Sequence, residues 1–114
     1  LWEKNMAHFI VTGCYTSTAM NGMIANPSDR EASTKALIEA AGGKIVNYFM
    51  TTGETDFMMV VDADDTGDMI APLLVAGASN TVSNLKTVRA FTSAEFMAAQ
   101  KKAGDIAIKF KPAG

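Results

Sequence analysis

One histidine and one aspartate are the residues of this chain best suited to acid–base chemistry. His8 begins a run of strand-forming residues, and Asp56 ends a polar turn just before a second such run. A carboxylate beside a histidine fixes the tautomer of the imidazole ring and raises its basicity, which makes the pair a common general acid or base. The same aspartate could instead only secure its own turn, since Asp often accepts hydrogen bonds from nearby backbone amides. The acid–base interpretation therefore requires a fold that brings the two side chains together.

The turn before this aspartate reads Gly53-Glu54-Thr55-Asp56 and runs directly into an apolar segment. Gly53 is expected to supply the positive φ that a tight turn needs. Glu54 is expected to be a solvated charge at the tip. The stretch is interpreted as a hairpin turn first, and as a site only if His8 is its neighbour.

Cys14 is the only cysteine of the chain, so it forms no internal disulfide. A nucleophilic cysteine needs a nearby base or a positive field. His8 lies about 20 Å away along an extended strand and is not that base within one chain. We therefore interpret Cys14 as a small buried hydrophobic side chain.

No metal or cofactor is expected. One histidine and one cysteine cannot build a soft metal site. The acidic residues at the end of the predicted third strand and just after it lack the spacing of a calcium loop. We interpret them as helix-capping residues whose charges also favour the start of the following helix; they are Asp62, Asp64, Asp65 and Asp68.

A small, largely apolar ligand is compatible with the methionine content. The chain has eight methionines, and methionine adapts to irregular apolar shapes. Met20 and Met23 lie on the long connection after the first strand, which could cover the sheet. The alternative is that the methionines only fill the core and a dimer interface. The candidate ligand contacts are Thr12, Cys14, Met20, Met23, Tyr48 and Met58.

Apolar periodicity, capping residues and turn residues predict four strands and three helices. Ser28 with Glu31 forms a capping box for the first helix, and Thr92 with Glu95 forms one for the last. Pro72 conflicts with the middle helix, which must start late or kink there. In chain order we expect a strand at 7–15, a connection at 16–27, a helix at 28–43 ended by two glycines, a strand at 44–52, a turn at 53–56, a strand at 57–63, a helix within 64–79, a strand at 81–91 and a helix from 92 to about 102.

This order predicts an α+β, ferredoxin-like fold of the βαββαβ type with a C-terminal helix. Its four-stranded antiparallel sheet would carry both crossover helices on one face. With the strand order 4-1-3-2, the strands at 7–15 and 57–63 are central neighbours. We expect these two to run in the same direction, so that His8 and Asp56 lie at the same end of the sheet.

Both faces of the predicted sheet carry large apolar side chains. Side chains alternate along a strand, so Val11 faces away from Ile10, and Met59 faces away from Met58. Two helices cover only one face, and each large side chain is worth about 1.5–3 kcal/mol when buried. An exposed apolar face of this size marks an interaction surface, so we expect a second copy packed against it as a symmetric dimer. In the rival arrangement, the third helix or the tail folds across the sheet of a monomer.

Composition excludes several classes of protein. The net charge of −2, without an evident basic patch, argues against a nucleic-acid partner. The absence of an 18-residue apolar run argues against a membrane span, and the first residues lack the apolar core of a signal peptide, so a cytoplasmic location is expected. The 114 residues suggest one domain at 7–103, an N-terminal extension at 1–6 and a C-terminal tail at 104–114.

Two segments, "NPSDREASTKALIEAAGGKIVNYFMTTGETDFMMVVDADD" and "VSNLKTVRAFTSAEF", resemble the GYD-domain family over about residues 8–97. These are small bacterial proteins of largely unknown function. The resemblance implies a ferredoxin-like, dimeric α/β-barrel fold and supplies no reaction. The family is named for Gly-Tyr-Asp in the turn between its second and third strands. Here Gly53 and Asp56 are kept and Thr55 stands at the tyrosine position, which argues against any role that needs a phenol there.

We therefore expect a small, non-catalytic, cytoplasmic homodimer or larger homo-oligomer. It would bind a small, largely apolar molecule between its sheets, or act through association alone. The alternative is a cofactor-free enzyme of the oxygenase or isomerase type, with the sheet interior as the pocket and His8 and Asp56 as the acid–base pair. A third possibility is a structural protein of a larger assembly. The enzyme requires that the two side chains converge on a cavity.

Overall fold

The computed structural model of the chain describes residues 6–64 and 67–114. Within them, four strands form one sheet, with four helices between and after the strands. The strands are β1 (Ala7–Tyr15), β2 (Lys44–Met50), β3 (Phe57–Ala63) and β4 (Val82–Ala90). The helices are α1 (Ser17–Ala25), α2 (Arg30–Ala40), α3 (Ile70–Ala78) and α4 (Ser93–Ala107).

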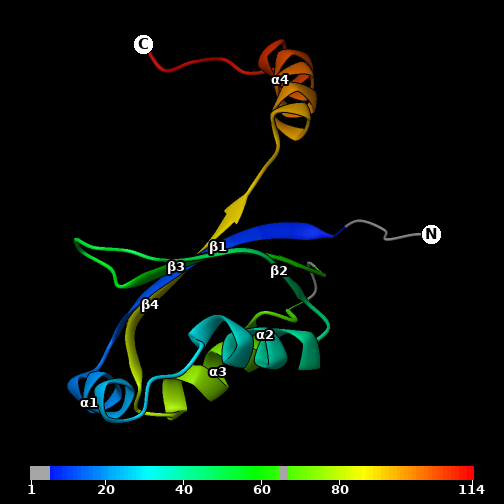
Figure 1. Cartoon of the computed structure of the whole chain (residues 1–114). Coiled ribbons are helices and arrows are strands. Elements are labelled where there is room, and N and C mark those ends of the chain that lie inside the picture. Colours follow the sequence, from blue (N-terminus) through cyan, green and yellow to red (C-terminus); the bar gives the residue numbers. More distant parts are fainter. Residues whose placement is uncertain (1–5, 65–66) are drawn as a thin grey trace.

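The sheet has the order β2-β3-β1-β4, and each pair of neighbouring strands is antiparallel. The helices α1, α2 and α3 lie on one side of it (Figure 1). This is the ferredoxin-like α+β fold that the sequence predicts, and the predicted strand order is confirmed. The face of the sheet turned away from these three helices is called the open face below.

The relative direction of the two central strands differs from the prediction. β1 and β3 are antiparallel, with His8 opposite Asp62 and Gly13 opposite Phe57. The β2–β3 hairpin reverses the chain, and the crossover from β1 leaves β2 parallel to it, so β3 must run against β1. His8 and Asp56 therefore lie at opposite ends of the sheet, and the predicted pairing of these two side chains is wrong.

Two helix starts also differ from the prediction. α1 lies where the sequence predicts an irregular connection; the Thr16 hydroxyl accepts a hydrogen bond from the Ala19 amide at 3.1 Å and caps it. Its first turn has no acidic residue, so the usual start signal is weak. The N-cap of α2 is Asp29 instead of Ser28, because the Asp29 carboxylate accepts from the Ala32 amide at 3.2 Å.

The helix α3 starts late, which resolves the conflict at Pro72. The proline lies in the first turn, where its missing N–H would have had no intrahelical partner. The N-cap residue is Met69 and no side chain caps the helix, so Asp64 does not have the capping role inferred for the acidic residues. Asp65 lies outside the described residues, as do residues 1–5 of the predicted extension.

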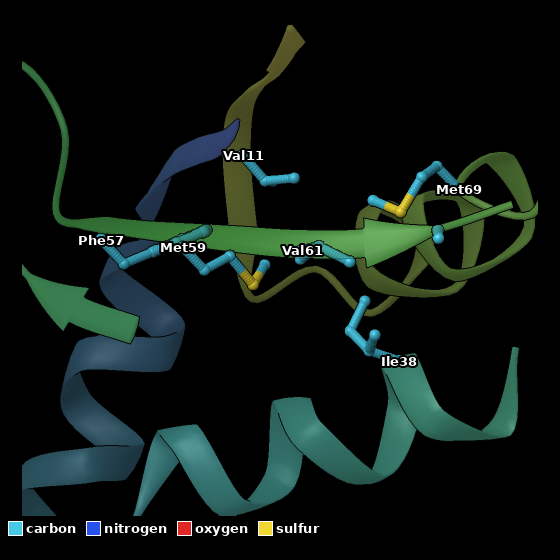
Figure 2. Packing of buried hydrophobic residues seen from close by; sticks show 7 residues of the cluster. Val11, Ile38, Phe57, Met59, Val61 and Met69 are labelled. Atoms are coloured by element: carbon cyan, nitrogen blue, oxygen red, sulfur yellow. The ribbon is translucent and has the colours of Figure 1, made fainter. Parts of the chain in front are cut away.

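The buried core lies between the sheet and the three covering helices. Val11 and Val61 are fully buried at the centre of β1 and β3. Ile38 of α2 points from the helix towards β3, near Val61 (Figure 2). The predicted alternation of faces is confirmed: in β3 every second residue from Phe57 is buried, and the residues between are only partly covered.

The helix α4 begins with the predicted capping box. The Thr92 hydroxyl accepts a hydrogen bond from the Glu95 amide at 3.1 Å, and the Glu95 carboxylate accepts one from the Thr92 amide at 2.7 Å. The helix runs to Ala107, past the predicted end near Lys102.

This last helix stands away from the sheet at the end of β4, on the side opposite α1–α3 (Figure 1). No residue of α4 is buried, and Phe96 is 63% exposed. The Cα radius of gyration is 18.1 Å, whereas a compact chain of about 100 residues has a radius of gyration of about 13 Å. The projecting helix α4 accounts for the larger value. In this structure, therefore, neither α4 nor the tail covers the open face.

Candidate ligand-binding site

A cavity of about 550 Å³ lies between the sheet and the helices α1, α2 and α3. It is partly open to solvent, and its lining is mostly apolar. Each covering helix and each strand contributes side chains. Representative lining residues are Tyr15 (β1), Met23 (α1), Arg30 (α2), Tyr48 (β2), Leu73 (α3) and Leu85 (β4).

Three aromatic rings group along the sheet side of this cavity. The Phe57 ring lies 5.2 Å from the Tyr15 ring and 6.5 Å from the Tyr48 ring, centroid to centroid, and is parallel to the latter within 2°. Gly13 makes room for them, because a Cβ atom there would lie 2.6 Å from the Phe57 ring. The two phenol oxygens are 3.1 Å apart and share a hydrogen bond.

The environment keeps the Tyr15 phenol neutral. Burial raises its pKa above the ordinary value, and the hydrogen bond with Tyr48 raises it further. Arg30 acts in the opposite direction and lowers the pKa by a smaller amount, which places its positive charge within the electrostatic reach of the phenol. Tyr15 is thus a hydrogen-bonding group inside the cavity and not an anion.

Arg30 is the single charged side chain among the described residues that line the cavity. It is the first residue of α2, so the capped start of that helix sets its position. Its guanidinium group donates to the hydroxyls of Ser28 at 3.2 Å and Ser33 at 3.4 Å. Among the described residues it forms no ion pair.

The turn residue Asp56 fixes the end of β1 from which Tyr15 enters the cavity. Its carboxylate accepts a hydrogen bond from the Tyr15 amide at 2.8 Å, and its own amide donates to the Gly13 carbonyl at 2.8 Å. The Thr51 amide donates to the Asp56 carbonyl at 2.9 Å and closes the hairpin. Gly53 has a φ of 97°, the positive value predicted for it.

His8 has a carboxylate partner, but it is Asp62. The two residues face each other across β1 and β3 on the open face, and His8 Nδ1 lies 2.5 Å from Asp62 Oδ1. Their side chains are 33% and 23% exposed. An imidazole–carboxylate pair therefore exists, at the opposite end of the sheet from Asp56 and outside the cavity.

The predicted ligand contacts divide between the two faces of the sheet. Met23 and Tyr48 line the cavity. Thr12, Cys14 and Met58 alternate with the buried residues of β1 and β3 and so belong to the open face. Met20 lies on α1 and is 42% exposed, not among the lining residues.

The tip of the hairpin meets β1 through Cys14 and Glu54. The Cys14 thiol donates to the Glu54 carbonyl at 3.2 Å. Cys14 is partly exposed, which differs from the fully buried side chain predicted. Thr55, at the motif's central position, contributes its carbonyl oxygen, which accepts a hydrogen bond from the Thr51 hydroxyl at 2.8 Å. These contacts are structural and hold the turn.

Tyr15 and Arg30 are the site residues that sequence reasoning misses. Tyr15 is the last residue of an apolar strand, and the strand pattern does not mark it as a ligand contact. Arg30 follows an N-cap residue and has the pattern of an ordinary exposed helix start. A signal exists in retrospect, because an arginine at N1 is unfavourable beside the helix dipole and suggests another role.

The described residues show neither a metal cluster nor a membrane helix. Across residues 6–64 and 67–114, no three His, Cys, Asp or Glu side chains gather in a way that could hold a metal ion. In the same ranges, no helix is long and apolar enough to cross a membrane.

Comparison with known proteins identifies a family whose model matches most of the chain. The model of the GYD domain matches residues 9–99. A search of curated proteins finds no significant match. Among solved structures, MtbAldR has a TM-score of 0.51 at 14% identity over 82% of this chain, and this chain spans 60% of its length. This likeness supports the fold alone.

Two further structures are similar at lower scores. PA3566 from Pseudomonas aeruginosa has a TM-score of 0.45 at 14% identity, over 81% of this chain and 98% of its own. The NE2512 protein of unknown function from Nitrosomonas europaea has 0.37 at 20% identity, over 96% and 95%.

Proposed function

The chain belongs to the GYD-domain family, and from that premise we propose that it is a non-catalytic protein that binds a small, largely apolar molecule. The site is the cavity between the sheet and the helices α1, α2 and α3. The observation that carries this proposal is the cavity itself, whose volume of about 550 Å³ lies within the roughly 300–1,000 Å³ of small-molecule sites.

This partly open space is far larger than the voids of a close-packed interior. Protein interiors are close-packed, and most internal voids are no larger than a water molecule. Here Val11, Met59 and Leu85 border a space that their own side chains do not fill. Replacing the water inside such a mostly apolar space by an apolar molecule lowers the free energy of the system.

We further propose that two copies associate through the open face. Ile10, Met58 and Val88 lie on this face, and Val88 is 54% exposed. Each large apolar side chain is worth about 1.5–3 kcal/mol when fully buried. An isologous dimer would cover the face with the same face of a second copy.

The projecting helix α4 also favours a second copy of the chain as the partner. Apolar and small residues recur along it at three- and four-residue spacing, as at Phe96, Ala103 and Ile106. An isolated helix of about 15 residues is marginal in water, so this stripe needs a partner surface. In a twofold dimer the α4 helix of each copy can pack against the other copy. This packing covers the apolar stripe, and no other protein is needed.

The cavity proposal is tested with a neutral fluorescent probe, N-phenyl-1-naphthylamine. The variant Gly22→Phe adds a ring at the cavity wall, where a Cβ atom would meet no atom within 4 Å. Gly77→Phe is the matched control, because Gly77 is also helical and open but does not line the cavity. We expect micromolar binding to the parent and the control, and at least about tenfold weaker binding to Gly22→Phe. Equal binding to all three would refute the site.

A cofactor-free enzyme is the second candidate, and it now depends on the contact of His8 with Asp62. This pair lies on the open face and would be enclosed between the sheets of a dimer. The test uses the molecule that accompanies the purified protein in native mass spectrometry. Conversion by the parent, but not by His8→Ala of the same assembly state, would establish an enzyme; binding without conversion would reject it.

A further inference from the structure

We propose that the cavity selects an amphipathic molecule with an anionic head group, a carboxylate being the simplest, and that Arg30 and Tyr15 receive this head. The inference rests on the proposed binding function and adds the chemical class of the ligand. It follows from how charge, hydrogen-bond donors and apolar surface are distributed around the cavity.

The charge in the lining is uncompensated. Arg30 is the single ionised group among the described residues that line the space, so no acidic side chain there offsets it. Its guanidinium group donates to the neutral hydroxyls of Ser28 and Ser33. A guanidinium group presents five donors and pairs best with a carboxylate or phosphate in a two-pronged geometry. An anionic ligand group would supply the missing counter-charge.

The phenol pair provides a second donor near this charge. One hydrogen bond joins the hydroxyls of Tyr15 and Tyr48 and uses one of their two protons. The other proton is free to reach an acceptor on a ligand. A phenol is neutral near pH 7 and burial raises the pKa of Tyr15 further, so Tyr15 donates to an anion and does not repel it.

The remainder of the lining suits a hydrocarbon body. Leu37, Met59, Leu73 and Leu85 come from α2, β3, α3 and β4 and border the same space. A molecule with its head at Arg30 can therefore bury its apolar part against both the sheet and the helices. A fully polar anion would leave these surfaces wet, and a plain hydrocarbon would leave the guanidinium group without a counter-charge.

The test compares two ligands that differ only in the head group. Octanoate and 1-octanol are each used to displace N-phenyl-1-naphthylamine at constant ionic strength. We expect octanoate to bind the parent about tenfold more tightly than 1-octanol, since a two-pronged ion pair of guanidinium and carboxylate is stronger than a hydrogen bond from the guanidinium to a hydroxyl. We expect Arg30→Gln to abolish this preference, because it weakens the binding of octanoate far more than the binding of 1-octanol.

Two further variants separate the charge at the site from charge in general. Lys35→Gln removes a positive charge from an exposed position of the same helix that does not line the cavity, and it should keep the preference. Tyr15→Phe should reduce the preference in part. Circular dichroism confirms that each variant is folded before it is titrated.

The outcomes separate this inference from the proposed function. If the neutral probe fails to bind the parent, the binding function itself is wrong. If the probe binds but octanoate and 1-octanol displace it equally, the cavity binds apolar molecules and does not distinguish between their head groups. A preference for octanoate that survives in Arg30→Gln would also overturn the inference.

Discussion

The carboxylate of Asp56 accepts a hydrogen bond from the backbone amide of Tyr15 at 2.8 Å. This contact joins the β2–β3 hairpin to the last residue of β1, 41 positions away in the chain. The phenol of the same Tyr15 lines the cavity and bonds with Tyr48. The aspartate of the family's named turn thus does not line the cavity and instead holds the strand end that carries Tyr15.

Replacing Asp56 by Ala should destabilise the fold and weaken probe binding. The change removes the acceptor of the Tyr15 amide, and a partly buried donor without a partner costs about 1–3 kcal/mol. Urea unfolding measures the loss. The control is Glu54→Ala in the same turn, whose exposed side chain should change the free energy of unfolding by less than about 0.5 kcal/mol. Equal stability of the two variants would show that the contact with Tyr15 contributes little to the free energy of unfolding.

The faces of the sheet could be predicted from the sequence, because side chains alternate along a strand regardless of tertiary context. The strand order also followed from the βαββαβ pattern. The alternation of Val11 with Ile10 and of Met59 with Met58 appears in the structure as predicted. Capping was predictable where both halves of the signal lie close in sequence, as for Thr92 and Glu95.

The partner of His8 could not be predicted in the same way, because it depends on strand direction and register. The predicted partner, Asp56, is wrong, because the antiparallel pairing of β1 and β3 places Asp62 opposite His8. Arg30 and Tyr15 are likewise fifteen positions apart, and only the packing of α2 on the sheet brings both to one cavity. Single-sequence patterns hold no information on that packing.

Gly13→Ala should destabilise the protein, although alanine is a better residue than glycine in most regular structure. A Cβ atom at this position would lie 2.6 Å from the Phe57 ring and 2.9 Å from Leu85. Relieving such a contact in a packed core costs about 1–3 kcal/mol. Gly22→Ala is the control: its Cβ would meet no atom within 4 Å, and it should stabilise α1 by about 0.5–1 kcal/mol. Thermal unfolding of both variants decides the matter, and a neutral Gly13→Ala would contradict the close packing of Phe57.

The raised pKa of Tyr15 makes stability fall in alkaline solution. Above pH 10, the ordinary pKa of the phenol, Tyr15 loses its proton in the unfolded chain but keeps it in the folded chain. The unfolded state then binds fewer protons, so the free energy of unfolding falls as pH rises. The variant Tyr15→Phe should show a shallower fall between pH 9 and 11, and the parent should lack one tyrosinate step at 295 nm near pH 10. Identical slopes for both proteins would argue against the raised pKa.

Introducing a charge on the open face should dissociate the proposed dimer and leave the single chain folded. Ile10→Asp places a carboxylate at the centre of that face, beside Val60 and Val88, where a partner sheet would have to desolvate it at a cost of several kcal/mol. Native mass spectrometry should record a dimer for the parent and a monomer for this variant, with unchanged helical circular dichroism. Leu74→Asp is the control, since Leu74 is an exposed apolar residue of α3 on the opposite side of the sheet, and it should remain dimeric. Because Ile10→Asp could disturb the sheet itself, Met58→Asp repeats the test from β3. A parent protein that is monomeric, or an Ile10→Asp variant that keeps the parent's mass, would show that the open face does not join two copies.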